Sequence, residues 1–167
     1  MPEALNLLKT RRSVKPIELA GPGPTAAEID ALLTVASRVP DHGKLTPWRF
    51  IVFEGDARTK ASRIIGDAFR ERRPDATSDQ VAVESARLAR APLVIAVVSR
   101  AAPHVKIPEW EQIMSAGASA TSLVMAAHAI GADHHQRAHG IHRGAAHILR
   151  ARRGSGRRSR SRVLYFT

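Results

Sequence analysis

The chain changes character near residue 131, and this change limits what it can fold into. Residues 1–130 carry 17 lysines and arginines against 14 acidic residues, a net charge of +3. Residues 131–167 carry nine arginines, no lysine and the single acid Asp133, a net charge of +8. A block of like charge without an apolar face cannot bury enough surface to offset its ordering entropy. We therefore expect a folded domain over 1–131 and an Arg/His-rich tail over 132–167 that is disordered or foreign to the fold.

The remaining bulk properties exclude several classes of protein. The chain has no cysteine, which excludes disulfide frameworks and thiol nucleophiles and fits a reducing compartment. Its start lacks the basic and apolar segments of a secretory signal. The longest apolar-rich stretch, 116–130, is shorter than the roughly 20 residues that span a bilayer. We expect a cytoplasmic protein that does not contact a membrane.

The spacing of apolar residues predicts most of the secondary structure. It predicts helices over 3–10, 25–38, 56–73, 78–91 and 108–130, and strands over 48–54 and 92–99. Thr25 and Glu28 form a capping box at the start of the second helix. The β-branched strand 92–99 is typical of one buried on both faces. This order indicates a mixed α/β or α+β fold whose sheet contains more than two strands.

Large apolar side chains at regular spacing indicate the core. We expect seven of them to be buried: Trp48, Ile64, Ile65, Phe69, Trp110, Met114 and Met125. The small residues of 115–120 permit another helix or a flat ligand to approach closely.

A few polar residues could carry chemistry. Arg11, Arg12 and Ser13 offer two guanidinium groups and a hydroxyl, which suit bidentate binding of a phosphate, although an Arg pair is also common on a solvated surface. Arg38 could bind a ligand or complement the end of its own helix. His42 could be a donor, a proton carrier or a structural residue. We find no catalytic triad, phosphate-cradling glycine loop or paired carboxylates, so the sequence fits a protein whose chemistry belongs to a bound cofactor.

The tail permits two further interpretations. Its histidines could share a metal ion, but neighbouring arginines place like charge beside the ion and we assign no metal site; these histidines are His134, His135, His139 and His142. The segment 154–162 is similar to Arg/Ser-rich nucleic-acid tails, which bind phosphates without sequence preference. A basic nucleic-acid-associated protein is therefore an alternative function.

Five segments, read together and in order, resemble the FMN-dependent nitroreductase family, most closely its small bacterial branch. They are LLKTRRSVK (7–15), GPT (23–25), ASRVPDHGKLTPWRFIVFEG (36–55), RAPLVIAVV (90–98) and PEWEQIMSAGASATSLVMAAHAIG (108–131). The resemblance implies an α+β fold, with a mostly antiparallel sheet flanked by helices. It also implies a homodimer that binds two FMN molecules at the subunit interface.

The same resemblance implies roles for the candidate residues. Arg11, Arg12 and Ser13 would hold the phosphate, ribityl chain and pyrimidine edge of FMN, while Arg38 and His42 would reach the flavin bound mainly by the other subunit. NAD(P)H would deliver hydride to the flavin and leave, and a small-molecule acceptor such as a nitroaromatic or a quinone would take its place. The resemblance assigns no catalytic side chain, and it leaves open the choice between NADH and NADPH.

The resemblance ends at Gly131. There the family continues with a Gly/Trp-containing segment, a helix and an apolar strand, none of which the tail resembles. The Arg-, Ala-, Gly- and His-rich composition of 132–167 is what a GC-rich gene yields when it is read out of frame. We hypothesise a frameshift near codon 131, with a natural tail as the alternative. Either change would impair the activity, and an inactive truncated fragment is the third functional alternative.

Overall fold

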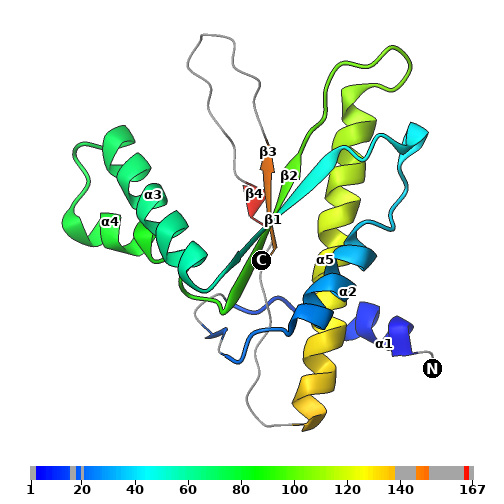
Figure 1. The fold of residues 1–167 in the computed structure, drawn as a ribbon, viewed down its shortest axis with the longest axis horizontal. Coiled ribbons are helices and arrows are strands. Elements are labelled where there is room, and N and C mark those ends of the chain that lie inside the picture. The colour runs from blue at the N-terminus through cyan, green and yellow to red at the C-terminus, as the bar shows by residue number, and fades with distance from the viewer. Residues whose placement is uncertain (1–2, 16–17, 20, 138–145, 151–163, 166–167) are drawn as a thin grey trace.

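The fold is a four-stranded sheet with helices on both of its sides (Figure 1). The computed structural model describes residues 3–15, 18–19, 21–137, 146–150 and 164–165. The helices are α1 (Glu3–Thr10), α2 (Ala26–Ala36), the 3-10 helix η2 (His42–Lys44), α3 (Asp56–Arg72), α4 (Ser78–Ser85) and α5 (Glu109–Arg137). The strands are β1 (Trp48–Glu54), β2 (Leu93–Ser99), β3 (Ala146–Arg150) and β4 (Leu164–Tyr165).

The strands follow one another across the sheet in chain order. β1 and β2 are antiparallel over their whole length, from Trp48 opposite Ser99 to Glu54 opposite Leu93. β3 runs parallel to β2, and β4 is antiparallel to β3. The sheet is therefore mostly antiparallel, which confirms the predicted α+β class. The sequence did not predict β3 or β4, which are only five and two residues long.

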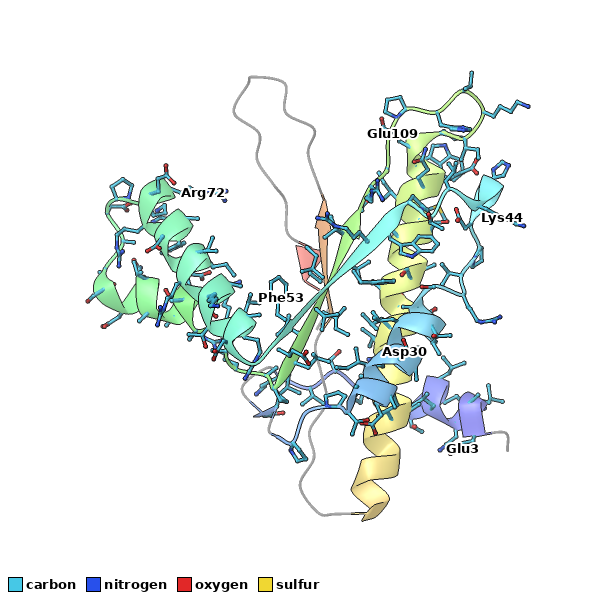
Figure 2. The ribbon with its side chains drawn as sticks, in the orientation of Figure 1. Glu3, Asp30, Lys44, Phe53, Arg72 and Glu109 are labelled. Atoms are coloured by element: carbon cyan, nitrogen blue, oxygen red, sulfur yellow. The ribbon has the colours of Figure 1, made fainter. Side chains whose placement is uncertain are left out.

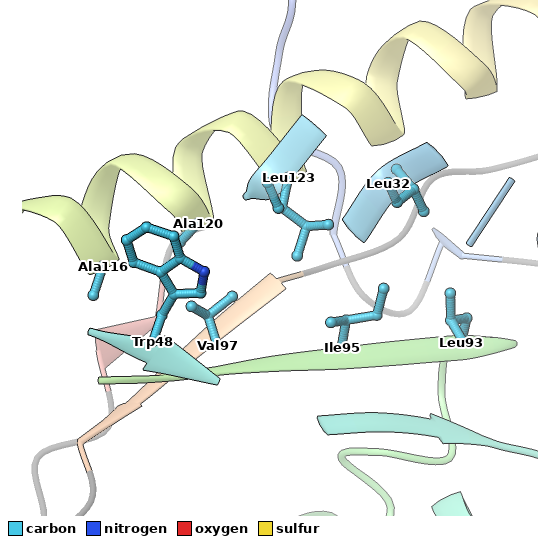
Figure 3. Packing of buried hydrophobic residues seen from close by; sticks show 9 residues of the cluster. Leu32, Trp48, Leu93, Ile95, Val97, Ala116, Ala120 and Leu123 are labelled. Carbon is cyan, nitrogen blue, oxygen red and sulfur yellow. The ribbon is translucent and has the colours of Figure 1, made fainter. Parts of the chain in front are cut away.

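The main core lies between one face of the sheet and the helices α2 and α5. Leu93, Ile95 and Val97 alternate along β2 and point toward these helices (Figure 3). They meet Trp48 of β1, and a set of mostly small side chains from the helices completes the cluster: Leu32, Ala36, Ala116, Ala120 and Leu123. The small residues of α5 thus admit α2, which is one of the two possibilities that the sequence raised.

The other face of β2 carries a second, smaller cluster. Val94, which points away from α5 because side chains alternate along a strand, packs with Leu19 and Ala91. Phe53 and Val14 lie against it. All seven residues of β2 are buried, which confirms the prediction of a strand covered on both faces.

The helices α3 and α4 pack against each other on the side of the sheet away from α5 (Figure 2). Gly66 permits this close approach, because a Cβ atom there would lie 1.9 Å from the Ser85 hydroxyl oxygen. Ile64 was expected to point inward, but its side chain is 68% exposed. The helix places Ser62 and Gly66 on its buried face instead, because small residues let α4 come close. α4 ends at Ser85, earlier than the predicted residue 91.

The helix α5 differs from the prediction in its length and in its exposed face. It continues beyond residue 130 to Arg137. Trp110 and Met114 were expected in the core, yet they are 60% and 65% exposed. The buried face of the helix is formed by smaller residues, whereas Trp110, Ile113 and Met114 lie together on the opposite face, since residues three and four apart are neighbours on a helix.

By length and composition, α5 could also cross a membrane, over Glu109–Gly131. This segment is longer than the apolar-rich stretch 116–130 that the sequence analysis considered. In this fold, however, Ala116, Ala120 and Leu123 form part of the main core. The packing identifies α5 as the central helix of a globular domain.

Candidate functional site

The segment Arg11–Ser13 directly follows α1. The amide of Arg11 donates to the Leu7 carbonyl at 2.9 Å, which completes the last turn of the helix. Arg11 is half-buried, whereas Arg12 and Ser13 are exposed. In the described part of the chain, neither guanidinium pairs with a carboxylate. Two cations without a protein counter-ion are suited to bind the phosphate of a ligand.

This segment is attached to α5 through His128. The ring Nε2 of His128 lies 2.9 Å from the carbonyl oxygen of Arg12, and Nδ1 lies 2.8 Å from the carbonyl oxygen of Val124. His128 is only 5% exposed. The sequence analysis did not select this residue, and its only signal was a single imidazole on an otherwise apolar helix face.

The loop that carries His42 has an unusual backbone. Lys44 and Thr46 have φ angles of 53° and 44°, which non-glycine residues seldom adopt. The Asp41 carboxylate accepts a hydrogen bond from the Thr46 amide at 2.8 Å and closes the loop. Gly43 suits this turn because its φ of 72° is a conformation that residues with a Cβ atom rarely adopt, and the Ile107 Cδ1 atom lies close to where that Cβ would be. Such strain is frequent in loops that bind ligands.

His42 contacts its own chain at the start of α5. Its Nδ1 lies 2.7 Å from a carboxylate oxygen of Glu111, and the His42 side chain is 64% exposed. When Nδ1 carries the proton and donates it to Glu111, Nε2 faces away from that carboxylate. Arg38 lies exposed just beyond α2, where its amide donates to the Val35 carbonyl. Its guanidinium has no ion-pair partner among the residues that the structure describes.

Four of the five predicted site residues form two groups at different positions along α5, and no contact among the described residues joins Arg38 to either group. Arg12 contacts His128, and His42 contacts Glu111. These two positions are 17 residues apart, which corresponds to about 25 Å along a helix with a rise of 1.5 Å per residue. The structure therefore brings Arg11, Arg12 and Ser13 together, but it does not bring them to His42 within one chain. The first group offers two guanidinium groups without a carboxylate partner among the described residues and a hydroxyl, which is the chemistry that an anionic phosphate ester requires.

Charge interactions elsewhere do not extend into this site. The guanidinium of Arg73 donates to Asp75, and this hydrogen bond lowers the pKa of the Asp75 carboxyl below its ordinary value. Both groups lie just beyond α3, on the far side of the sheet (Figure 2). Both side chains are exposed, so solvent screens the pair.

The tail predictions concern residues whose side chains lie outside the described part of the chain. These are the histidines considered as metal ligands and the Arg/Ser-rich segment considered as a nucleic-acid contact. Within the described residues, no group of three potential ligands is arranged to hold a metal ion.

Comparison with solved structures shows the fold class first. A nitroreductase-like protein from Bacillus cereus is similar with a TM-score of 0.64 at 19% identity, covering 93% of this chain and 72% of the other. A nitroreductase with bound FMN from Bacteroides fragilis is similar with a TM-score of 0.54 at 18% identity, covering 78% and 67%. The chain thus has a nitroreductase-like α+β fold.

Comparison of sequences then shows the family. The sequence model of the nitroreductase family matches residues 8–135. The chain is 40% identical over 131 residues to "Putative NAD(P)H nitroreductase YdjA" of Escherichia coli K12, covering 77% of this chain and 68% of that protein. It is 39% identical over 133 residues to a "Putative NAD(P)H nitroreductase" of Haemophilus influenzae, covering 78% and 70%. The chain belongs to the nitroreductase family.

Proposed function

We propose that this chain is the subunit of an FMN-dependent NAD(P)H oxidoreductase that reduces small electron acceptors such as nitroaromatics or quinones. Bound FMN would supply the redox chemistry, taking hydride from NAD(P)H and passing it to the acceptor in two successive half-reactions. The protein would bind and orient the participants and would need no nucleophile of its own. Membership of the nitroreductase family and the names of its relatives support this proposal.

The observation that carries the proposal is the Arg11–Ser13 segment. Its two guanidinium groups have no carboxylate partner in the described residues, and its backbone is tied to the central helix. Arg11 and Arg12 would form charge-assisted hydrogen bonds with the FMN phosphate, and the Ser13 hydroxyl would donate or accept one more. This arrangement would hold the phosphate end of FMN relative to the sheet.

We also propose that the working unit is a homodimer. The separation of His42 from Arg12 along α5 means that one protomer offers only part of the predicted site. In a two-fold dimer whose α5 helices run antiparallel, each His42 end would lie near the Arg12 end of the other chain. The exposed Trp110, Ile113 and Met114 offer an apolar surface on α5 for such a contact.

A cytoplasmic location is part of the proposal. The packing of α5 into the main core supports a globular protein outside the membrane.

The proposal is tested by FMN titration of the chain and its variants, followed by flavin fluorescence. We expect Arg11→Ala and Arg12→Ala each to weaken FMN binding by about one to two decades, since a hydrogen bond to a charged group contributes roughly 1.5–3 kcal/mol. Arg63→Ala is the matched control, because Arg63 is an exposed arginine of α3. Measurable FMN binding of equal affinity in all four proteins would contradict the proposal.

A further inference from the structure

His128 joins two parts of the molecule that are far apart in the sequence. It is a buried residue of α5, and the Arg12 carbonyl that contacts its Nε2 at 2.9 Å belongs to a residue 116 positions earlier. Its other nitrogen contacts the Val124 carbonyl within the same helix turn, at 2.8 Å. Both partners are carbonyl oxygens, which accept, and a neutral imidazole has a single N–H group. When Nε2 carries that proton the ring donates to Arg12, and the Val124 contact is a hydrogen bond only when Nδ1 is protonated as well.

The segment between α1 and the second core cluster has few other attachments. Arg11 ends α1 through its amide hydrogen bond to Leu7. Val14 is the next residue that packs against a buried cluster. Between them, Arg12 and Ser13 form no other hydrogen bond with the described residues than the one between Arg12 and His128. Between the flanking anchors at Arg11 and Val14, this contact is therefore the one hydrogen bond among the described residues that holds the backbone of Arg12 and Ser13.

We propose that His128 is the positioning residue of the phosphate-binding segment. Its Nε2–H group donates to the Arg12 carbonyl and holds the backbone from which Arg11, Arg12 and Ser13 project. This inference rests on the proposed function, in that the ligand of the segment is the FMN phosphate. His128 itself acts through the backbone of Arg12 and does not contact the ligand.

Two substitutions of similar size separate positioning from simple loss of packing. In His128→Gln, the side-chain amide nitrogen takes approximately the place of Nε2 and can still donate to Arg12. In His128→Asn, the shorter amide reaches approximately the place of Nδ1 and cannot reach Arg12. Leu123→Ala is the control for general destabilisation, because Leu123 is a core residue of the same helix and has no hydrogen bond to the segment.

The first measurement does not require FMN. Trypsin cleaves after Arg11 and Arg12 only when this backbone opens locally, so the cleavage rate reports how firmly the segment is held. We expect His128→Asn to accelerate cleavage at these two sites about tenfold relative to cleavage after Arg63 on α3, which is the effect of losing one hydrogen bond of typical strength. His128→Gln should stay near the unsubstituted ratio, and Leu123→Ala should accelerate cleavage at all sites alike.

The second measurement is FMN affinity by fluorescence titration. We expect His128→Asn to weaken binding by about tenfold and His128→Gln to restore most of the affinity. An unchanged cleavage ratio in His128→Asn would overturn the positioning role, as would equal losses of affinity in His128→Asn, His128→Gln and Leu123→Ala. A raised cleavage ratio in His128→Asn with unchanged FMN affinity would support the attachment of the segment and overturn its role in binding FMN instead.

Discussion

At the scale of single residues, two serines of α5 differ in whether their buried hydroxyl has a hydrogen-bond partner, and this should decide how each contributes to stability. Ser115 is nearly buried, and its hydroxyl donates to the Pro40 carbonyl. Ser119, one turn further along, is fully buried, and its hydroxyl has no partner among the described residues. A buried hydroxyl without a partner has lost its hydration without compensation.

We therefore predict opposite effects for the two alanine substitutions. Ser115→Ala should lower the free energy of unfolding by about 0.5–1.5 kcal/mol, because it removes a hydrogen bond and leaves the Pro40 carbonyl without that donor. Ser119→Ala should leave the free energy unchanged or raise it, since alanine also has the higher helix propensity. Urea denaturation of both variants measures the difference. A clear loss of stability in Ser119→Ala would indicate that its hydroxyl has a partner after all.

Residue contacts across long stretches of sequence were not predictable. The RRS motif could be selected from the sequence because its three members are adjacent. The contact between His42 and Glu111 joins residues 69 positions apart, and the contact between His128 and Arg12 spans 116. Neither partner carries a local signal of the other. For this reason the sequence named the groups that we propose to bind phosphate but not the histidine that contacts their backbone.

At the scale of elements, the sequence predicts best where local chemistry and tertiary packing agree. The capping box at Thr25 starts α2 as predicted, with the Glu28 carboxylate accepting from the Thr25 amide at 2.7 Å. β1 has the predicted bounds, and β2 lies within the predicted strand. The prediction that Trp110 and Met114 of α5 are buried was wrong, because the small residues of the helix, rather than its large ones, permit close packing on the sheet and on α2. Size alone did not reveal which face is buried.

The exposed face of α5 leads to a prediction about assembly. Trp110→Glu should convert a dimer into a monomer, because a tryptophan within an interface commonly contributes about 2 kcal/mol or more, and a buried charge adds a further cost. Ile64→Glu is the matched control, since Ile64 is equally exposed but lies on α3. Light scattering after size-exclusion chromatography gives the mass of each variant. The same mass for the unsubstituted chain and Trp110→Glu would place the interface elsewhere or exclude a dimer.

At the scale of the whole molecule, the similarity of structure extends further along the chain than the match to the family sequence model. The family match ends at residue 135, whereas the similarity to the Bacillus cereus structure covers 93% of the chain and so extends into the tail. The strand β3 lies parallel to β2, with Ile95 opposite Ala146. The tail therefore supplies strands to the sheet although its composition is not that of a sheet protein. We propose that residues 132–167 are a frame-shifted version of the segment that the family has there.

This proposal predicts the content of the coding DNA. Translated in another frame downstream of codon 131, it should encode a segment with Trp and Gly, then a helical pattern, then an apolar strand. Stop codons or the lack of any periodic pattern in both other frames would contradict the frameshift and favour a natural tail.

The frame-restored chain should also be more stable and hold FMN more tightly than the chain as it stands. A native domain is stable by only about 5–15 kcal/mol, and each large apolar side chain that a restored strand buries contributes roughly 1.5–3 kcal/mol. A few such side chains are comparable to the whole margin, so thermal denaturation of the two chains, side by side with and without FMN, should separate them clearly. Equal melting temperatures and equal FMN content would mean that the Arg-rich tail completes the sheet as well as the family segment does.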